Sequence, residues 1–121
     1  MPKVKITNAK GLVQETGSGF TLSSSLVLDR QTVAAAGNAI GNATAISSTE
    51  PLVVVTGANG TAGVRLPAVA NLDAGTTFLI QNFGNNTLEV YPTANDRVYP
   101  AADNASITVA AYGFLQVSVA D

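Results

Sequence analysis

The sequence predicts an all-β protein: an antiparallel β-sandwich or barrel, jelly-roll-like, preceded by an extended N-terminal arm. Three observations predict it. Apolar and polar residues alternate over short runs, and Gly, Asn or Pro separates these runs about every 8–14 residues. No segment shows a comparably strong helical periodicity. The length of 121 residues is typical of a single domain, whose main part we call the body. We place that body at residues 20–121 and the arm at residues 1–19.

The first residues of the chain have the pattern of an arm. Three of the six basic residues lie within the first ten positions, and no acidic residue precedes Glu15. Residues 3–7 alternate Lys, Val, Lys, Ile and Thr, which predicts a short strand with one apolar face. Residues 17–19 read Gly-Ser-Gly and predict a hinge. The first strand of the body is expected within residues 20–28.

The middle of the chain is weakly patterned, and the rest is strongly β. Glycines at 37 and 41 argue against a helix, so a loop or short strands are expected over residues 32–50. Beyond Pro51, Asn59-Gly60 suits a tight hairpin turn because both residues tolerate positive φ. Strands are predicted at 52–55, 63–66, 76–82, 87–91, 105–109 and 115–119.

The composition favours association with other molecules. Charged residues make up 12% of the chain, against about 25% in an ordinary domain. Since charge repulsion normally keeps monomers apart, such a surface suggests assembly. A net charge of −2 argues against a strongly basic nucleic-acid binder. No apolar run is long enough to span a membrane, and the N-terminus lacks the apolar region of a signal peptide. Synthesis in a cytoplasm without an export signal is therefore expected.

The sequence offers little catalytic equipment. It has no histidine and no cysteine, which are the commonest general base, metal ligand and soft nucleophile. Eight acidic residues remain, without a pattern that suggests a cleft. We therefore expect no enzymatic activity and no cofactor. Asp96 and Asp103, with Asn95 and Asn104, form an oxygen-rich segment of the kind that Ca²⁺ prefers. Local Asx-turns are the favoured interpretation, and no metal site is predicted.

Aromatic residues towards the C-terminus have two interpretations. One is a sugar-binding face, on which Tyr91, Tyr99, Tyr112 and Phe114 would stack against a sugar. Aromatics are only 6% of the chain and there is no tryptophan. Half-buried strand positions are therefore the favoured interpretation.

Residues 51–119 resemble a pattern found in small virion proteins of tailed bacteriophages. The resemblance rests on three stretches. They are Val64-Arg65-Leu66-Pro67, Gly75-Thr76-Thr77-Phe78-Leu79-Ile80-Gln81-Asn82 and Asn86-Thr87-Leu88-Glu89-Val90-Tyr91-Pro92. The strands that flank them, Leu52 to Thr56 and the C-terminal pair, complete the pattern. The chain is similar in this respect to head decoration (cement) proteins, and to modules of tail and fibre proteins.

The resemblance implies a structural role on the virion. Decoration proteins are usually homotrimers at local three-fold positions of the capsid. There they bridge major capsid subunits against internal DNA pressure. An N-terminal arm often pairs with capsid strands. The expected partner is thus the major capsid protein, and the expected capsid-contact residues are Lys3, Val4, Lys5, Ile6 and Lys10. A frayed, solvated terminus is the alternative for this segment.

A second function remains open for the whole chain: a trimeric receptor- or glycan-binding module of a tail fibre. The length of the chain, without a coiled-coil or collagen-like stalk, favours decoration. The expected location is the capsid surface, after synthesis in the host cytoplasm.

Overall fold

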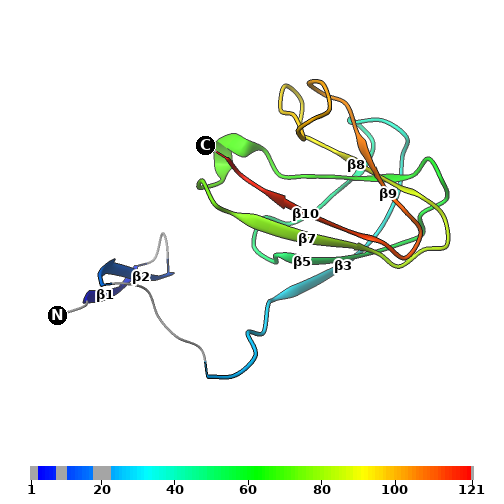
Figure 1. Ribbon diagram of the computed structural model, residues 1–121. Helices are drawn as coiled ribbons and strands as arrows, with labels where there is room; N and C mark the ends of the chain where they lie inside the picture. Colours follow the sequence, from blue (N-terminus) through cyan, green and yellow to red (C-terminus); the bar gives the residue numbers. More distant parts are fainter. Residues whose placement is uncertain (1–2, 8–10, 18–22, 121) are drawn as a thin grey trace.

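The structure is a computed structural model that describes residues 3–7, 11–17 and 23–120 (Figure 1). Strands dominate it, and the one helix of the described residues is the short 3-10 turn η1 (Val69–Asn71). The prediction of an all-β protein is confirmed. The strands of the body form two four-stranded sheets, and a separate two-stranded sheet precedes them.

The first sheet has the strand order β10-β7-β5-β3, and the second has the order β4-β6-β8-β9. The strands of the first sheet are β3 (Arg30–Ala34), β5 (Leu52–Thr56), β7 (Thr77–Asn82) and β10 (Phe114–Ser118). Those of the second sheet are β4 (Thr44–Ala45), β6 (Gly63–Arg65), β8 (Leu88–Tyr91) and β9 (Ile107–Val109). Consecutive strands from β3 to β8 therefore lie in alternate sheets.

This alternation overturns the prediction that the strands pair in an antiparallel manner. The pairs β3–β5, β5–β7, β4–β6 and β6–β8 are parallel, whereas β7–β10 and β8–β9 are antiparallel. After each strand the chain forms one strand of the other sheet before it returns to the first sheet. The strand it then adds to the first sheet therefore runs in the same direction as the previous one. Both sheets are mixed.

The expected hairpin at Asn59-Gly60 is wrong for the same reason. Strand β5 belongs to the first sheet and β6 to the second, so the two strands do not pair. The local turn chemistry is nevertheless present: the Asn59 side-chain carbonyl accepts the backbone N–H groups of Thr61 and Ala62, at 3.0 and 2.8 Å. Gly60 has a φ of 96°, as a turn glycine should. The turn carries the chain between sheets.

One apolar core joins the two sheets. In β5, β7 and β8 every second residue is buried, which matches the two-residue period of β-structure. The first sheet contributes Val53, Val55, Phe78 and Ile80, and the second contributes Val64, Leu88, Val90 and Val109. Most of these side chains are entirely removed from solvent. Burial of this apolar surface is the main force that holds the sheets together.

Asn82 is the one polar side chain fully buried in this core. Its amide nitrogen donates to the carbonyl oxygens of Asn86 (2.8 Å), Val109 (3.3 Å) and Ala110 (3.0 Å). Its amide oxygen accepts the N–H of Gly84 at 2.9 Å. The side chain thus ties the end of β7 to the end of β9, and every buried side-chain polar atom in the described residues has a partner.

The N-terminal segment contains a β-hairpin in its described part. Strand β1 (Lys3–Thr7) pairs antiparallel with β2 (Gly11–Thr16), with Val4 opposite Gln14. The strand predicted at residues 3–7 is confirmed, and β2 was not predicted. The arm and the boundary between residues 19 and 20 stay predictions.

Between residues 23 and 50 the structure differs from one expectation and agrees with another. The first strand is expected within residues 20–28, but its described part, residues 23–28, forms no strand, because no described strand pairs with it; β3 begins at Arg30. The short strands allowed for residues 32–50 are present as β3 and β4. Between them Gly37 has a φ of 71°, and a Cβ there would collide with Asn42.

Candidate functional site: the open edge of the first sheet

Strand β10 forms one edge of the first sheet and exposes unpaired backbone groups. The Asn82 N–H donates to the Gly113 carbonyl at 2.8 Å, and the Val119 N–H donates to the Thr76 carbonyl at 2.9 Å. These bonds set the phase of the antiparallel ladder: odd-numbered residues of β10 bond to β7. The N–H and C=O groups of Phe114, Gln116 and Ser118 therefore point away from the sheet. We call this side of β10 the open edge.

The side chains of β10 do not protect the open edge. Its sequence, Phe-Leu-Gln-Val-Ser, has no charge and no proline, and its pairing with β7 shows no bulge. Soluble proteins usually protect such edges with charges, proline or bulges, because an unprotected edge pairs with other chains. Phe114, Gln116 and Ser118 are also exposed at the outer face of the sheet. The open edge has the properties of an association surface.

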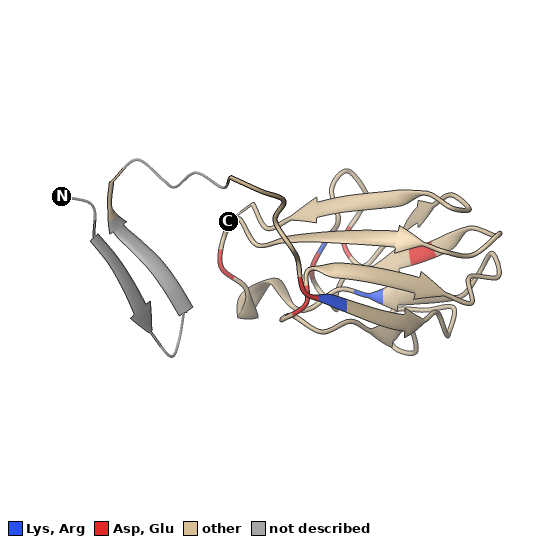
Figure 2. Cartoon of the chain, turned by 90° about the horizontal axis from the view of Figure 1, so that it is seen from below, with Lys and Arg blue, Asp and Glu red and all other residues tan. Residues whose placement is uncertain are grey.

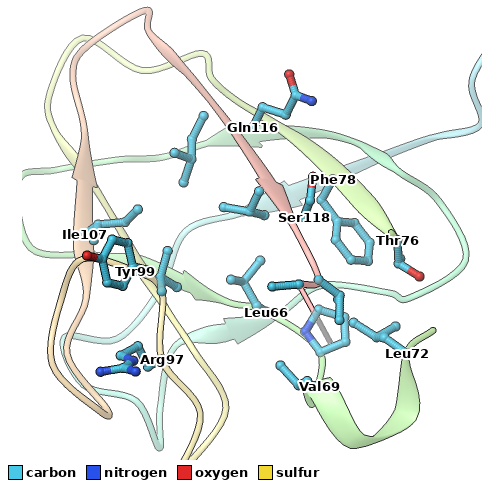
Figure 3. Close-up of a pocket in the computed structure, with 16 residues that line it drawn as sticks. Leu66, Val69, Leu72, Thr76, Phe78, Arg97, Tyr99, Ile107, Gln116 and Ser118 are labelled. Atoms are coloured by element: carbon cyan, nitrogen blue, oxygen red, sulfur yellow. The ribbon is translucent and has the colours of Figure 1, made fainter. Parts of the chain in front are cut away.

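An apolar pocket lies directly beside the open edge. It has a volume of about 520 Å³, within the roughly 300–1,000 Å³ typical of binding pockets. The core-facing side of β10 lines it with Leu115 and Val117. Figure 3 shows Arg97 and Tyr99 on one side of the pocket and Thr76 and Phe78 on the other. Further apolar lining comes from Leu66, Val69, Leu72 and Ile107. An apolar side chain that arrives along β10 would find contacts here.

Exposed aromatic side chains gather at one end of the same sheet. Phe83, Tyr112 and Phe114 are 60%, 71% and 74% exposed. The Tyr112 N–H donates to the Gly84 carbonyl at 3.1 Å, which holds the segments that carry these residues together. Tyr99, at the pocket, is 83% exposed. The favoured interpretation of half-buried aromatics is therefore wrong for Tyr99, Tyr112 and Phe114.

Tyr91 is half-buried as expected, but it lies on the second sheet, away from the open edge and the apolar pocket. On the outer face of the second sheet its ring lies across Gly63, where an added Cβ would approach Tyr91 Cε2 to 2.7 Å. Beside it, Glu89 Oε2 accepts the Ser106 hydroxyl at 2.6 Å. Together with Asn38, Gly60 and Thr61 they line a shallow polar hollow of about 390 Å³. An aromatic ring for stacking, a carboxylate that accepts hydrogen bonds and an amide that donates and accepts them together suit a sugar.

The oxygen-rich segment near residue 100 makes protein contacts. The Asn104 side chain accepts the Asn95 N–H at 2.7 Å, and both residues have positive φ, as asparagine tolerates. Asp96 Oδ2 accepts the N–H of Val69 at 2.9 Å and so holds η1. Asp103 lies 3.8 Å from Arg97 in an exposed ion pair. Within the described ranges no group of His, Cys, Asp or Glu is arranged to hold a metal ion.

The structure places part of the predicted capsid-contact set. Lys3, Val4, Lys5 and Ile6 lie in β1, where the backbone alone is described, and Lys10 lies outside the described residues. Their contacts with a capsid stay a prediction. Figure 2 shows how sparse Lys, Arg, Asp and Glu are across the two sheets. The open edge and its pocket were not predicted, since the alternation in residues 114–118 looks the same in an edge strand and a central strand.

Comparisons with known proteins give no relative: no protein-family profile, curated protein or solved structure matches the chain significantly. In the described part of the chain no helix is long and apolar enough to cross a membrane.

Proposed function

We propose that this chain is a virion structural protein, a decoration (cement) protein that binds the outer surface of a phage head as a homotrimer and bridges major capsid subunits. The observation that supports it best is the uncharged open edge of β10 beside an apolar pocket, because that combination suits association by strand addition. The resemblance of residues 51–119 to phage virion proteins supplies the particular setting. We further propose that the body is a β-sandwich preceded by an N-terminal arm.

The proposed mechanism is multivalent and non-covalent. Each subunit contributes a weak contact from its arm, with Lys3 and Lys5 near acidic capsid groups and Val4 and Ile6 on an apolar face of a capsid strand. In a trimer, binding of the first arm raises the effective concentration of the other two, so modest individual contacts give firm attachment. The bridged capsid subunits then separate less readily under internal pressure.

Titration onto capsids that lack the protein tests this function. We expect saturable binding in multiples of three copies and a rise in the thermal stability of the capsid. Removal of residues 1–10 should abolish attachment while the circular dichroism of the body is unchanged. As a matched control, Arg30→Gln removes an exposed basic group from β3, away from the pocket, and should leave attachment intact. Failure of the full chain to bind capsids would contradict the proposal.

The polar hollow supports a second candidate, a receptor- or glycan-binding module of a tail fibre. Tyr91 offers a ring for stacking, and Glu89 and Asn38 offer hydrogen-bond partners. If this function is correct, the chain binds host-cell glycans on an array, and Tyr91→Ala weakens that binding. Tyr99→Ala, a change of an exposed tyrosine outside the hollow, serves as its control. Binding to capsids and to no glycan would exclude it.

A further inference from the structure

The open edge lacks a partner within the described chain, yet three of its residues offer a full set of donors and acceptors. The N–H and C=O groups of Phe114, Gln116 and Ser118 point outward, at the spacing that one more strand would bond. Leu115 and Val117, between them, point towards the apolar pocket. A strand added here would gain backbone hydrogen bonds on one side and apolar contacts on the other.

A segment with the matching chemistry lies before β3. Residues 23–28 (Ser-Ser-Ser-Leu-Val-Leu) carry no charge and form neither helix nor strand. Leu26 and Val27 are 64% and 89% exposed, which is costly for aliphatic side chains. No hydrogen bond joins these six residues to other described parts of the chain. They are therefore an uncharged, largely exposed segment whose backbone has no hydrogen-bond partner among the described residues.

The topology places the open edge at one edge strand of the first sheet, and this donor segment just before the other edge strand. The donor leads into β3, whereas the open edge belongs to β10, and β5 and β7 lie between them. The two edges are thus separated by three strand spacings, roughly 14 Å. A donor at one edge and an acceptor at the other make a head-to-tail contact between copies, and such contacts close into rings or continue as open chains.

We propose that residues 24–28 of one copy add as a strand to the open edge of β10 in a second copy. With the two-residue period of a strand, Leu26 and Leu28 share one face and enter the apolar pocket beside Leu115 and Val117. Val27 then lies on the outer face, near Phe114. The inference builds on the self-association in the proposed function and names the surfaces that create it; three such contacts close the trimer.

The two halves of the contact are tested by separate variants. Gln116→Pro removes an outward N–H from the open edge and leaves the β7 ladder intact. Thr32→Pro is its matched control, because the ladder phase of β3 points the Thr32 N–H outward at the opposite edge of the same sheet. Leu26→Glu places a charge on the donor, and Ser23→Glu, at an exposed residue just before the donor, is its control. Circular dichroism checks that each variant is folded.

Size-exclusion chromatography with light scattering gives the readout. We expect the wild-type protein and both controls to assemble as trimers, while Gln116→Pro and Leu26→Glu are monomers. Mixed together, these two variants should form a 1:1 heterodimer, since one retains a donor and the other an open edge. A monomeric wild type would overturn the proposal. So would Gln116→Pro alone losing assembly, because that result indicates β10 pairing with β10.

Capsid titration separates this inference from the proposed function. Assembly through the contact without capsid binding would leave the inference standing and refute decoration. Capsid binding by monomeric wild-type protein would overturn the inference and leave attachment through the arm standing.

Discussion

The two edge strands of the first sheet, β3 and β10, differ in how the rest of the chain covers them. Gln31, Val53, Ile80 and Leu115 form one row across the sheet, so Gln31 and Leu115 occupy equivalent places at its two ends. Gln31 donates to the carbonyls of Ser47 and Glu50, at 3.0 and 2.8 Å, and accepts the Ser47 N–H at 2.8 Å. Leu115 instead lines an open apolar pocket.

Backbone groups at the two edges show the same contrast. At the β3 edge, the Thr44 hydroxyl donates to the outward carbonyl of Ala34 at 2.7 Å, and Arg30 supplies a charge. At the β10 edge, neither a charge nor a covering segment is found among the described residues. The chain thus covers part of one edge with its own side chains and leaves the other able to accept a strand. An edge of this second kind indicates where a neighbouring molecule binds.

The largest expected effect concerns the internal support of the open edge. Asn82→Ala removes four hydrogen bonds, one buried and three partly buried, at the link between β7, β9 and the turn before β10. The carbonyls of Val109 and Ala110 lose their buried donor, so we expect a loss of about 3 kcal/mol in the free energy of unfolding. Denaturant unfolding measures it. Asn85→Ala, an exposed control, should cost less than about 0.5 kcal/mol; equal losses would contradict the assigned role.

The next change makes the closed edge resemble the open one. Gln31→Leu removes the three hydrogen bonds to Ser47 and Glu50 and exposes an apolar side chain. We expect a loss of about 1–2 kcal/mol in the free energy of unfolding, reduced by water that reaches the freed groups. Gln116→Leu, on the outer face of β10, should change it by less than about 0.5 kcal/mol. If both substitutions cost the same, Gln31 does not close its edge.

A charge at the open edge should affect association and not folding. Gln116→Lys places an ammonium group on an exposed position of β10, as edge-protected strands do. We expect the free energy of unfolding to change by less than about 0.5 kcal/mol. Analytical ultracentrifugation should show a shift towards monomer. Thr32→Lys at the β3 edge is the control, and an equal shift there would mean that the two edges do not differ.

The smallest expected effect lies in the loop beside the pocket. Arg97 and Asp103 lie 3.8 Å apart with side chains 55% and 69% exposed, so solvent screens their attraction. Asp103→Asn should lower the free energy of unfolding by about 0.3 kcal/mol at low salt and by less at high salt. Unfolding at two salt concentrations checks this. A loss above about 1 kcal/mol would show that this ion pair contributes more to the free energy of unfolding than its exposure implies.

Local patterns predicted the strands better than their arrangement. The alternation around Val53, Ile80 and Val90 shows which residues are buried, since a strand with one buried face has a period of two. The turn at Asn59-Gly60 was also predicted. Its role as a link between sheets was not, because turn residues specify a local backbone shape and carry no information about which strand will pair. Parallel pairing arises only from the whole path of the chain.

The candidate site was harder to predict than the fold. Whether a strand lies at an edge depends on strand order, and residues 114–118 alternate as a central strand of an antiparallel sheet would. The same holds for Gln31, whose partners lie 16 and 19 residues away. The two-residue β4 is too short to leave a pattern. The low charge of the chain was the compositional signal that indicated association.

Amide hydrogen exchange over a range of protein concentrations tests the central claim most directly. The N–H groups of Phe114, Gln116 and Ser118 are predicted to exchange quickly at low concentration and to become protected as concentration rises. Those of Leu115 and Val117, bonded to β7, should be protected throughout. If the three outward amides exchange at the same fast rate at every concentration, no second copy adds to the open edge.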